Sequence, residues 1–274
     1  MVGKLYHKLW EAGSIENFKQ AWLDCVECLY LVRKLGKVLH RDLSEGNRMI
    51  LKLADGRVNG VLNDWDMARF VDADDSNMEL DNEPRIGTPP FMAHDHLRMQ
   101  CVPHYLRHDL EPFSYILVWA ALHYNLKEGT RDRQPHPVVA GWMGSRDENR
   151  SSKLFLLMYD TDLVEEASAT VKPEFAGVLT EWIGPLQFLF AGASLNHYKR
   201  LRTDPNTVSN PTVITPPMAG SIWRPLHLLD VEEGVLKGAF SFGGDLTFKK
   251  FMAALNVTPR TWGIPNFLDN ADEF

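Results

Sequence analysis

The chain has 274 residues, of which 45% are hydrophobic and 24% charged, so it can form one large globular domain or two small ones. Its formal net charge of -7 does not favour generic binding to nucleic acid or to anionic lipid. The N-terminus lacks the apolar run of a signal peptide, and no apolar stretch approaches the ~20 residues of a membrane helix. We therefore expect a protein without a membrane segment, located in the cytoplasm or the nucleus.

The first predicted element is a long helix over residues 15–35. Ser14 can cap its start, and Gly36 can end it after Arg33 and Lys34 have complemented the helix dipole. The apolar residues that recur at spacings of three and four define one buried face. They are Phe18, Trp22, Cys25, Leu29 and Val32.

The same helix contains two of the three cysteines at CxxC spacing. Cys25 and Cys28 invite a zinc or redox interpretation, but no second Cys/His pair at zinc spacing follows. We interpret them as packing residues. Together with Cys101 they form a sparse, odd set, which is typical of a reducing compartment and not of a disulfide framework.

A β-hairpin is predicted next. The apolar runs 49–51 and 58–62 flank Asp55-Gly56, a strong turn signal. Residues 69–90 are acidic and polar with no periodicity, which predicts a long functional loop.

The rest of the chain is predicted to be mainly helical. Residues 113–122 are apolar on all sides, as in a helix buried all round, and residues 154–159, 175–190 and 245–255 favour further helices. Residues 203–218 are rich in Pro, Thr and Asn and indicate a surface excursion.

The densest chemical signal lies between His40 and Asp64. Asp42 and Asn47 share a short loop in which Gly46 permits a tight bend, and the hairpin returns the chain so that Asp64 can face that loop. Phosphoryl transfer needs a carboxylate that orients the attacking hydroxyl and oxygen ligands that hold Mg²⁺ on the phosphates. Asp and Asn supply these hard ligands. The spacing therefore predicts a phosphotransferase site.

These motifs resemble protein kinases. Residues 40–47 (HRDLSEGN) match the kinase catalytic loop, Asp64-Trp65-Asp66 stands where kinases have DFG, and residues 87–93 (GTPPFMA) resemble the end of an activation segment. Residues 108–111 (HDLE) open the buried helix. Taken together, the chain resembles the fungal-type protein kinase family, over roughly residues 10–200.

The resemblance implies a mainly α fold, the large C-terminal lobe of a kinase with a small hairpin at the catalytic loop. It implies ATP and Mg²⁺ as cofactors and a protein hydroxyl as substrate. Asp42 is then the catalytic base, while Asn47 and Asp64 are the metal and cofactor ligands. Thr88 is expected to approach Asp42 and to help position the substrate.

The resemblance also implies supporting roles. His40 is expected to pack the loop and to bond the backbone near Asp64, and Arg41 to connect the loop with the activation segment. Asp109 is expected to hold the catalytic loop from below; the alternative is a simple helix N-cap. Ser44 replaces the lysine that most Ser/Thr kinases place two residues after the base, although the fungal-type family also tends to have serine there.

Further departures concern the nucleotide. Asp66 replaces the DFG glycine, and Asp95 stands in place of the APE glutamate. The 39 residues before His40 contain no glycine-rich loop and no VAIK-like lysine. We therefore expect that the N-terminal β-rich lobe is absent, and that the chain is inactive unless a partner or further segment supplies that lobe. The expected layout is a kinase-like lobe over residues 1–202, with catalytic loop 38–47, metal motif 64–66 and activation segment 64–95, followed by a Pro-rich excursion and a packed helical extension over 203–274.

Three functions stay open on these grounds. The first is a protein kinase lobe that acts when completed. The second is a pseudokinase or interaction module that keeps the motifs without catalysis. The third is a small-molecule phosphotransferase of the aminoglycoside or choline kinase kind, which shares the Asp-Trp-Asp pattern. Arg41 and residues 87–93 favour protein kinases over this third class.

Overall fold

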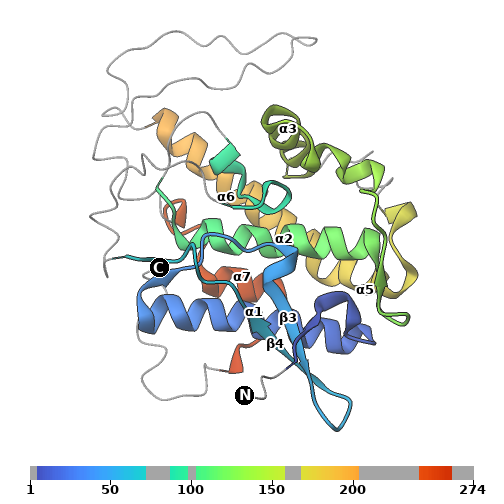
Figure 1. Ribbon diagram of the computed structural model, residues 1–274. Coiled ribbons are helices and arrows are strands. Elements are labelled where there is room, and N and C mark those ends of the chain that lie inside the picture. Colours follow the sequence, from blue (N-terminus) through green and yellow to red (C-terminus); the bar gives the residue numbers. More distant parts are fainter. Residues whose placement is uncertain (1–4, 72–86, 98–102, 158–167, 204–240, 261–274) are drawn as a thin grey trace.

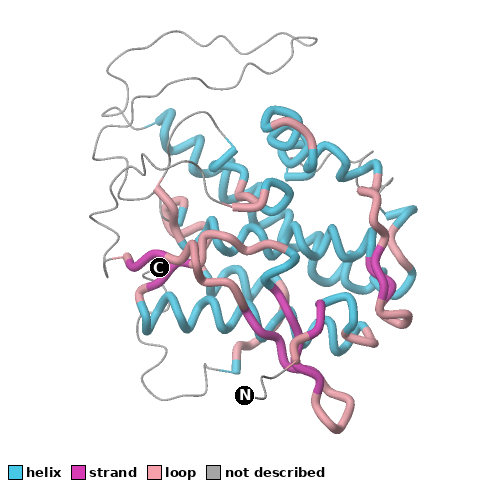
Figure 2. Tube along the Cα trace, viewed as in Figure 1, coloured by secondary structure: helices cyan, strands magenta, loops and turns pink. Residues whose placement is uncertain are grey.

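The computed structural model describes residues 5–71, 87–97, 103–157, 168–203 and 241–260, and it is mostly helical, as predicted. Strands are short and lie in separate places around the helices (Figure 2). No helix among the described residues is both long and apolar enough to cross a membrane. The main helices are α1 Ile15–Gly36, α2 Leu106–His123, α3 Arg146–Leu157, α5 Ala176–Val178, α6 Gly184–Thr203 and α7 Phe248–Ala254.

The strands form three small antiparallel sheets. In the largest, β3 lies between β1 and β4, and the β3–β4 hairpin runs from the Arg48–Leu62 pair to the Lys52–Val58 pair. Gly56, with φ 84°, occupies the turn. The strands are β1 His7–Lys8, β2 Val38–Leu39, β3 Arg48–Lys52, β4 Val58–Leu62, β5 Arg69–Phe70, β6 Tyr124–Asn125 and β7 Thr130–Arg131.

Short single-turn helices connect these elements. They are the 3-10 turns η1 Leu9–Glu11, η2 Glu45–Asn47, η3 Pro89–Phe91, η4 His94–Leu97, η5 Pro137–Met143 and η6 Pro173–Phe175, and the π-helical turn η7 Leu179–Ile183.

Helix α1 begins as predicted but ends one residue later. The Ser14 hydroxyl accepts a hydrogen bond from the Asn17 amide at 3.2 Å, so it caps the helix. Gly36 stays helical, and Lys37 supplies the left-handed residue with φ 54°. The prediction that Gly36 ends the helix was wrong, because the β2–β5 pairing fixes the chain from Lys37 onwards: its carbonyl accepts the Val71 amide at 2.8 Å.

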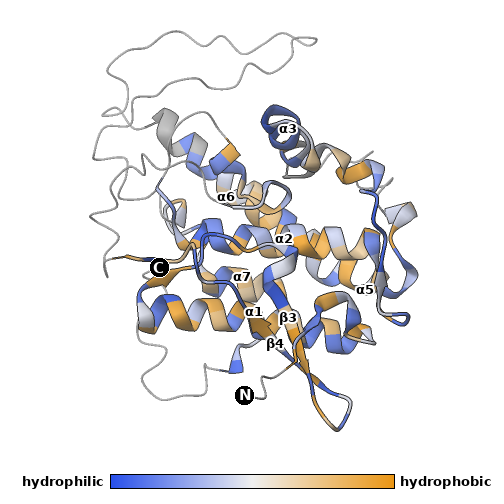
Figure 3. Ribbon diagram, viewed as in Figure 1, coloured by the Kyte–Doolittle hydropathy of each residue, from blue (hydrophilic) through white to orange (hydrophobic). Residues whose placement is uncertain are grey.

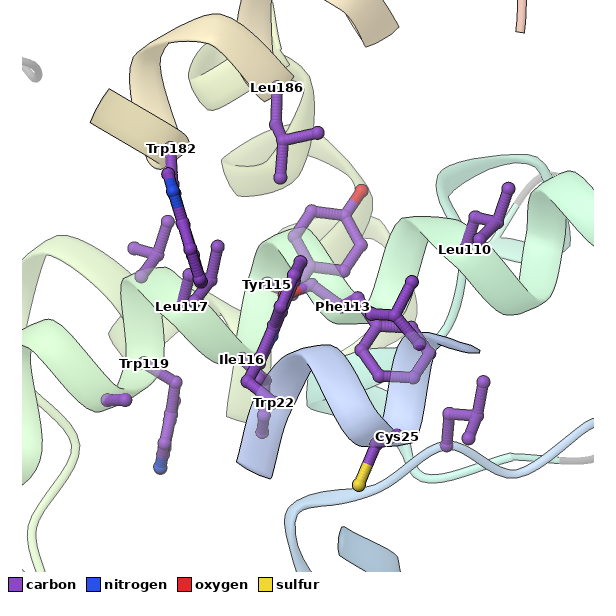
Figure 4. Packing of buried hydrophobic residues seen from close by; sticks show 14 of the residues in the cluster. Trp22, Cys25, Leu110, Phe113, Tyr115, Ile116, Leu117, Trp119, Trp182 and Leu186 are labelled. Atoms are coloured by element: carbon purple, nitrogen blue, oxygen red, sulfur yellow. The ribbon is translucent and has the colours of Figure 1, made fainter. Parts of the chain in front are cut away.

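The core lies between α1 and α2, which run side by side in Figure 1, with α7 packed on α1. Trp22 of α1 packs edge-on against Phe113 of α2 (Figure 4), and the Trp22 indole N–H donates to the Phe113 carbonyl at 3.2 Å. The packing interpretation of the cysteines is confirmed, since Cys25 belongs to the buried core and Cys28 packs against it. Burial raises the pKa of the Cys25 thiol, which keeps it protonated and unreactive.

Helix α2 is longer than predicted. It starts at Leu106, seven residues before the apolar run, and every one of its residues is buried. Its first two turns contain Arg107, His108, Asp109 and Glu111, each of which has at least one polar partner inside the protein. Hydropathy therefore underestimates this helix, because buried charges that are paired look like surface residues in a sequence.

The remaining predictions shift at their boundaries. Helix α3 occupies residues 146–157 and starts eight residues before its predicted position; its first turns are polar (Figure 3). The single helix predicted over 175–190 divides into η6, α5, the π turn η7 and α6. Helix α7 is capped by the Thr247 hydroxyl. The Pro-rich excursion from residue 204 and most of the acidic loop, residues 72–86, lie outside the described residues.

The C-terminal helix contacts the helix that delivers the catalytic loop. The Phe248 ring stacks on Tyr30 with centroids 3.8 Å apart, and Phe251 stacks on Trp22 at 6.1 Å. Arg260 pairs with Asp24 at 2.5 Å. The described part of residues 203–274 thus packs on the rest, while the expected domain boundary at 202 falls inside α6 and stays a prediction.

Gly60 in β4 is a point where two backbones meet. A Cβ atom there would overlap the Ala21 carbonyl oxygen of α1 and would lie 2.8 Å from the Asp24 Cβ. The Gly60 amide also donates to the Asp24 carboxylate at 2.7 Å. The hairpin can therefore approach α1 only if this residue has no side chain.

We predict that Gly60→Ala lowers the free energy of unfolding by about 3 kcal/mol or more, because backbone has to move to relieve the overlap. Chemical denaturation monitored by circular dichroism measures this. Gly192→Ala in α6 is the matched control, since nothing lies within 4 Å of its added Cβ, and it should be neutral or slightly stabilising. Equal stabilities of the two variants would contradict the close approach of β4 to α1.

Candidate functional site

The catalytic loop is held by the Asp109 carboxylate. One oxygen accepts the His40 amide at 2.7 Å, and the other accepts the Arg41 amide at 3.0 Å. The His104 ring donates to the second oxygen at 2.8 Å. Asp109 lies in the first turn of α2, whose N-cap is Tyr105, so it is not a simple N-cap. Burial by itself raises the pKa of Asp109, but His104 and the amide donors outweigh it and hold this pKa below its ordinary value.

His40 joins the loop to the far end of the hairpin. Its Nε2 donates to the Asn63 carbonyl at 3.1 Å, and its Nδ1 accepts the Asp42 amide at 3.4 Å. The ring is buried and lies 4.4 Å from the Trp65 ring. Burial lowers the pKa of His40, so the neutral ring with its proton on Nε2 suits both bonds. The structure thus places His40 against the backbone next to Asp64.

The Asp42 carboxylate is oriented from two sides. One oxygen accepts both the amide and the hydroxyl of Thr88, at 3.0 and 2.9 Å. The other accepts the Asn47 side-chain amide at 3.3 Å, and that amide also donates to the Asp42 carbonyl at 2.8 Å. Thr88, which lies 46 residues from Asp42 in sequence, and Asn47 of the same loop therefore meet around one carboxylate.

Asp64 lies beside Asn47 because of a backbone hydrogen bond at the end of the hairpin. The Asn63 amide donates to the Asn47 carbonyl at 2.9 Å, beyond the last β3–β4 pair, so the chain reaches Asp64 beside Asn47. Asp64 is exposed, and its backbone is left-handed with φ 59°. Because Asn47 uses its nitrogen toward Asp42, its amide oxygen is the atom left for a cation. An amide oxygen and an exposed carboxylate fit Mg²⁺.

Arg41 and Ser44 shape the loop. Arg41 has φ 72°, unusual for a residue with a long side chain, and is fixed there by its bond to Asp109. Ser44 precedes the turn η2 and is buried, and its carbonyl accepts the Asn47 amide at 3.2 Å. Most of the activation segment that Arg41 was expected to contact, residues 72–86, lies outside the described residues.

Sequence reasoning missed Glu45 as a support. One of its oxygens accepts the Trp119 indole N–H at 3.1 Å and the Tyr124 hydroxyl at 2.8 Å, and the other pairs with Arg131 at 2.8 Å. These partners come from the end of α2 and from β6 and β7. The signal was present in the motif itself, because a carboxylate in the middle of this loop needs partners once the loop packs on a helix.

Arg48 was missed as well. It is fully buried beneath the loop and donates to the carbonyls of Leu43 and Ser44 at 3.0 and 3.1 Å. Its guanidinium lies 4.3 Å from the centre of the Phe113 ring. Burial lowers the pKa of Arg48 to about 10, which leaves it charged at neutral pH. A strand position gives no sequence signal for this role.

The segment that carries Thr88 is fixed by α3. The Lys153 ammonium donates to the carbonyls of Pro89 and Met92, at 3.2 and 2.6 Å, and Asn149 donates to Pro89 at 2.7 Å. Lys153 is fully buried, which lowers its pKa to about 7, while the nearby Glu111 carboxylate opposes that shift. No local pattern links these residues, which lie some sixty positions apart.

Asp95, in place of the expected APE glutamate, has a partner close by. It forms an ion pair with Arg107 of α2 at 2.7 Å, although its side chain is shorter than that of glutamate. The residues on either side of Asp95 contact the same helix. The His94 backbone amide donates to the Glu111 carboxylate at 2.7 Å, and the His96 ring lies 4.2 Å from the His108 ring.

Residues 3–121 match the family model described as fungal protein kinase. This part of the chain is thus similar to the fungal protein kinase family. The resemblance seen in the motifs is therefore confirmed, and the matched range includes the catalytic loop, the hairpin, Asp64, Thr88 and most of α2. A search of curated proteins gave no match.

We predict that Asp109→Ala lowers the free energy of unfolding by about 3–5 kcal/mol, because two buried amides and His104 lose their acceptor. The matched control is Ser14→Ala, which removes only a helix cap and should cost ~1 kcal/mol. Urea unfolding at neutral pH measures both. A loss of only ~1 kcal/mol for Asp109→Ala would contradict this role and would be no larger than the loss of a helix cap.

Lowering the pH should reduce the difference in the free energy of unfolding between wild type and Asp109→Ala. The pKa of Asp109 is lower in the folded state than its ordinary value of 3.8, so the stabilisation by this carboxylate is complete above that value. The contribution is lost as the pH falls through the folded pKa. The gap between wild type and Asp109→Ala should thus shrink on acidification, whereas the gap between wild type and Ser14→Ala should not.

Proposed function

We propose that this chain carries the catalytic-loop half of a protein kinase, which transfers the γ-phosphoryl group of ATP to a protein hydroxyl. The observation that carries the proposal is the double orientation of the Asp42 carboxylate by Thr88 and Asn47. The similarity of residues 3–121 to the fungal protein kinase family supports it.

In this proposal Asp42 is the catalytic base. The hydroxyl oxygen of the substrate bonds to the γ-phosphorus as the bond from that phosphorus to the leaving ADP oxygen breaks, and Asp42 takes the hydroxyl proton. Thr88 keeps one carboxylate oxygen in a fixed direction, which leaves less motion to be lost when substrate binds. Ser44 lies two residues after the base and contributes no charge there.

Asn47 and Asp64 are proposed as the Mg²⁺ ligands. When bound, Mg²⁺ would neutralise part of the phosphate charge. The fit rests on the free amide oxygen of Asn47 and on the exposed carboxylate beside it. His40 and Asp109 act as positioning residues, because they fix the backbone on either side of the base.

The contact between Asp42 and Thr88 also bears on the substrate class. Thr88 belongs to residues 87–93, the segment that small-molecule phosphotransferases generally lack, and Lys153 and Asn149 hold that segment against the base. This arrangement supports a protein substrate over an aminoglycoside or a choline.

A second candidate is a non-catalytic interaction module. It is favoured by Asp66 in place of the DFG glycine, which limits the backbone freedom of the motif that carries Asp64. Nucleotide binding and phosphate transfer separate the two candidates.

We predict that the chain binds Mg²⁺·ATP only weakly, with a dissociation constant well above the micromolar range, because Asn47 and Asp64 offer few ligands. Isothermal titration calorimetry at fixed Mg²⁺ measures it. Asp64→Asn should abolish the residual binding. Asp55→Asn is the matched control, an exposed carboxylate at the opposite end of the same hairpin. Micromolar affinity that needs Asp64 would show that a nucleotide clamp exists elsewhere in the chain.

We predict that Asp42→Asn lowers phosphate transfer by a factor of about 10²–10⁴, since it removes the base and keeps the shape. Transfer of radiolabelled phosphate from ATP to a mixture of basic and acidic test proteins measures it, with circular dichroism to check folding. A variant as active as wild type would exclude Asp42 as the base. A folded wild-type chain without any transfer would favour the interaction module.

A further inference from the structure

Three histidines come together beside the proposed base. His96 lies on η4, His104 precedes α2, and His108 lies in the first turn of α2. Each offers one ring nitrogen, and these three nitrogens all lie within 4.8 Å of one another. We propose that they form a binding site for a transition-metal cation of the Zn²⁺ class, separate from the proposed Mg²⁺ ligands.

His104 has the bonding pattern of a metal ligand. Its Nε2 donates to the Asp109 carboxylate at 2.8 Å, which leaves the lone pair on Nδ1. Ligating histidines usually donate their second ring N–H to a carboxylate or a carbonyl, because that bond fixes the ring and increases its basicity. Asp109 would therefore serve both the catalytic loop and the metal ligand.

His108 supplies an independent observation. It is fully buried, and its Nε2 has no hydrogen-bond partner among the described residues. The Asp95 carboxylate lies 3.5 Å from this nitrogen and is already paired with Arg107. A buried ring nitrogen without a hydrogen-bond partner is costly, and a cation bound there would give it a partner.

Coordination by His108 requires an exchange. Its Nδ1 accepts the Tyr105 amide at 3.1 Å, so the neutral ring carries its proton on Nε2. A cation must displace that proton, and the Tyr105 amide must then give up its acceptor. The site should consequently bind more weakly than a preformed one, and its affinity should fall as the pH falls.

The chemistry of the donors selects the kind of cation. Neutral imidazoles suit Zn²⁺, Cu²⁺ and Ni²⁺, whereas Mg²⁺ and Ca²⁺ prefer oxygen. Burial lowers the pKa of His96 and His108, so both are neutral at physiological pH. Three histidine ligands leave one tetrahedral position open, as in catalytic zinc sites.

The location gives the site a consequence. The three histidines line the same pocket as Asp42 and Thr88. A cation there would connect η4, at the end of the activation segment, with the start of α2, next to the base. This inference does not depend on the proposed kinase activity.

The test is a titration of the full chain with Zn²⁺, after dialysis against a chelator, followed by calorimetry and thermal melts. One equivalent should bind and raise the melting temperature. His96→Asn should weaken binding at least about tenfold. His7→Asn is the matched control, a histidine paired with Glu11 far from the cluster, and should bind as wild type does.

A second measurement covers variants that fold poorly. Co²⁺ added to the wild-type chain should give the visible absorption of a tetrahedral site, and Zn²⁺ should remove it. His104→Gln, which keeps a donor for Asp109, should lose that spectrum while staying folded. Absence of binding by wild type, or equal losses in His96→Asn and His7→Asn, would overturn the proposal.

Discussion

The arrangement of the site depends on one buried carboxylate. Asp109 accepts the amides of His40 and Arg41, and through them it fixes the backbone that presents Asp42. Without this acceptor the His40 and Arg41 amides would lose their hydrogen-bond partner, and the left-handed conformation of Arg41 would lose the bond that stabilises it. The other contacts of the loop refine a position that Asp109 sets.

Local patterns were sufficient for the parts of this structure whose causes are local. The capped helix α1, the hairpin around Gly56 and the order of the catalytic motifs follow from residues a few positions apart. Hydropathy alone placed the start of α2 too late, because its buried polar residues are paired with groups that only the fold brings near, and only the resemblance of residues 108–111 to a kinase motif came within two residues of it. The left-handed cap of α1 at Lys37 was missed for a similar reason, since a strand pair fixes the chain there.

The contacts of the candidate site also differ in whether the sequence could predict them. The approach of Thr88 to Asp42 followed from the resemblance, and the structure contains it. The contributions of Glu45 and Lys153 were missed, and their partners lie more than sixty residues away. The three histidines lie within twelve positions of one another, but they form no pattern that predicts their meeting. The roles of Asn47 and Asp64 in metal binding stay predictions that rest on their geometry.

The loop is attached to a single helix at two levels, through Asp109 near the start of α2 and through Glu45 on Trp119 near its end. These levels are separated by about 15 Å of helix, whose rise hardly changes under thermal motion. The helix therefore fixes the distance between the two attachments of the loop. One residue inserted between them would rotate them by about 100° relative to each other. A change in the spacing or in the helical phase of the two attachments along α2 would therefore change the geometry of the loop.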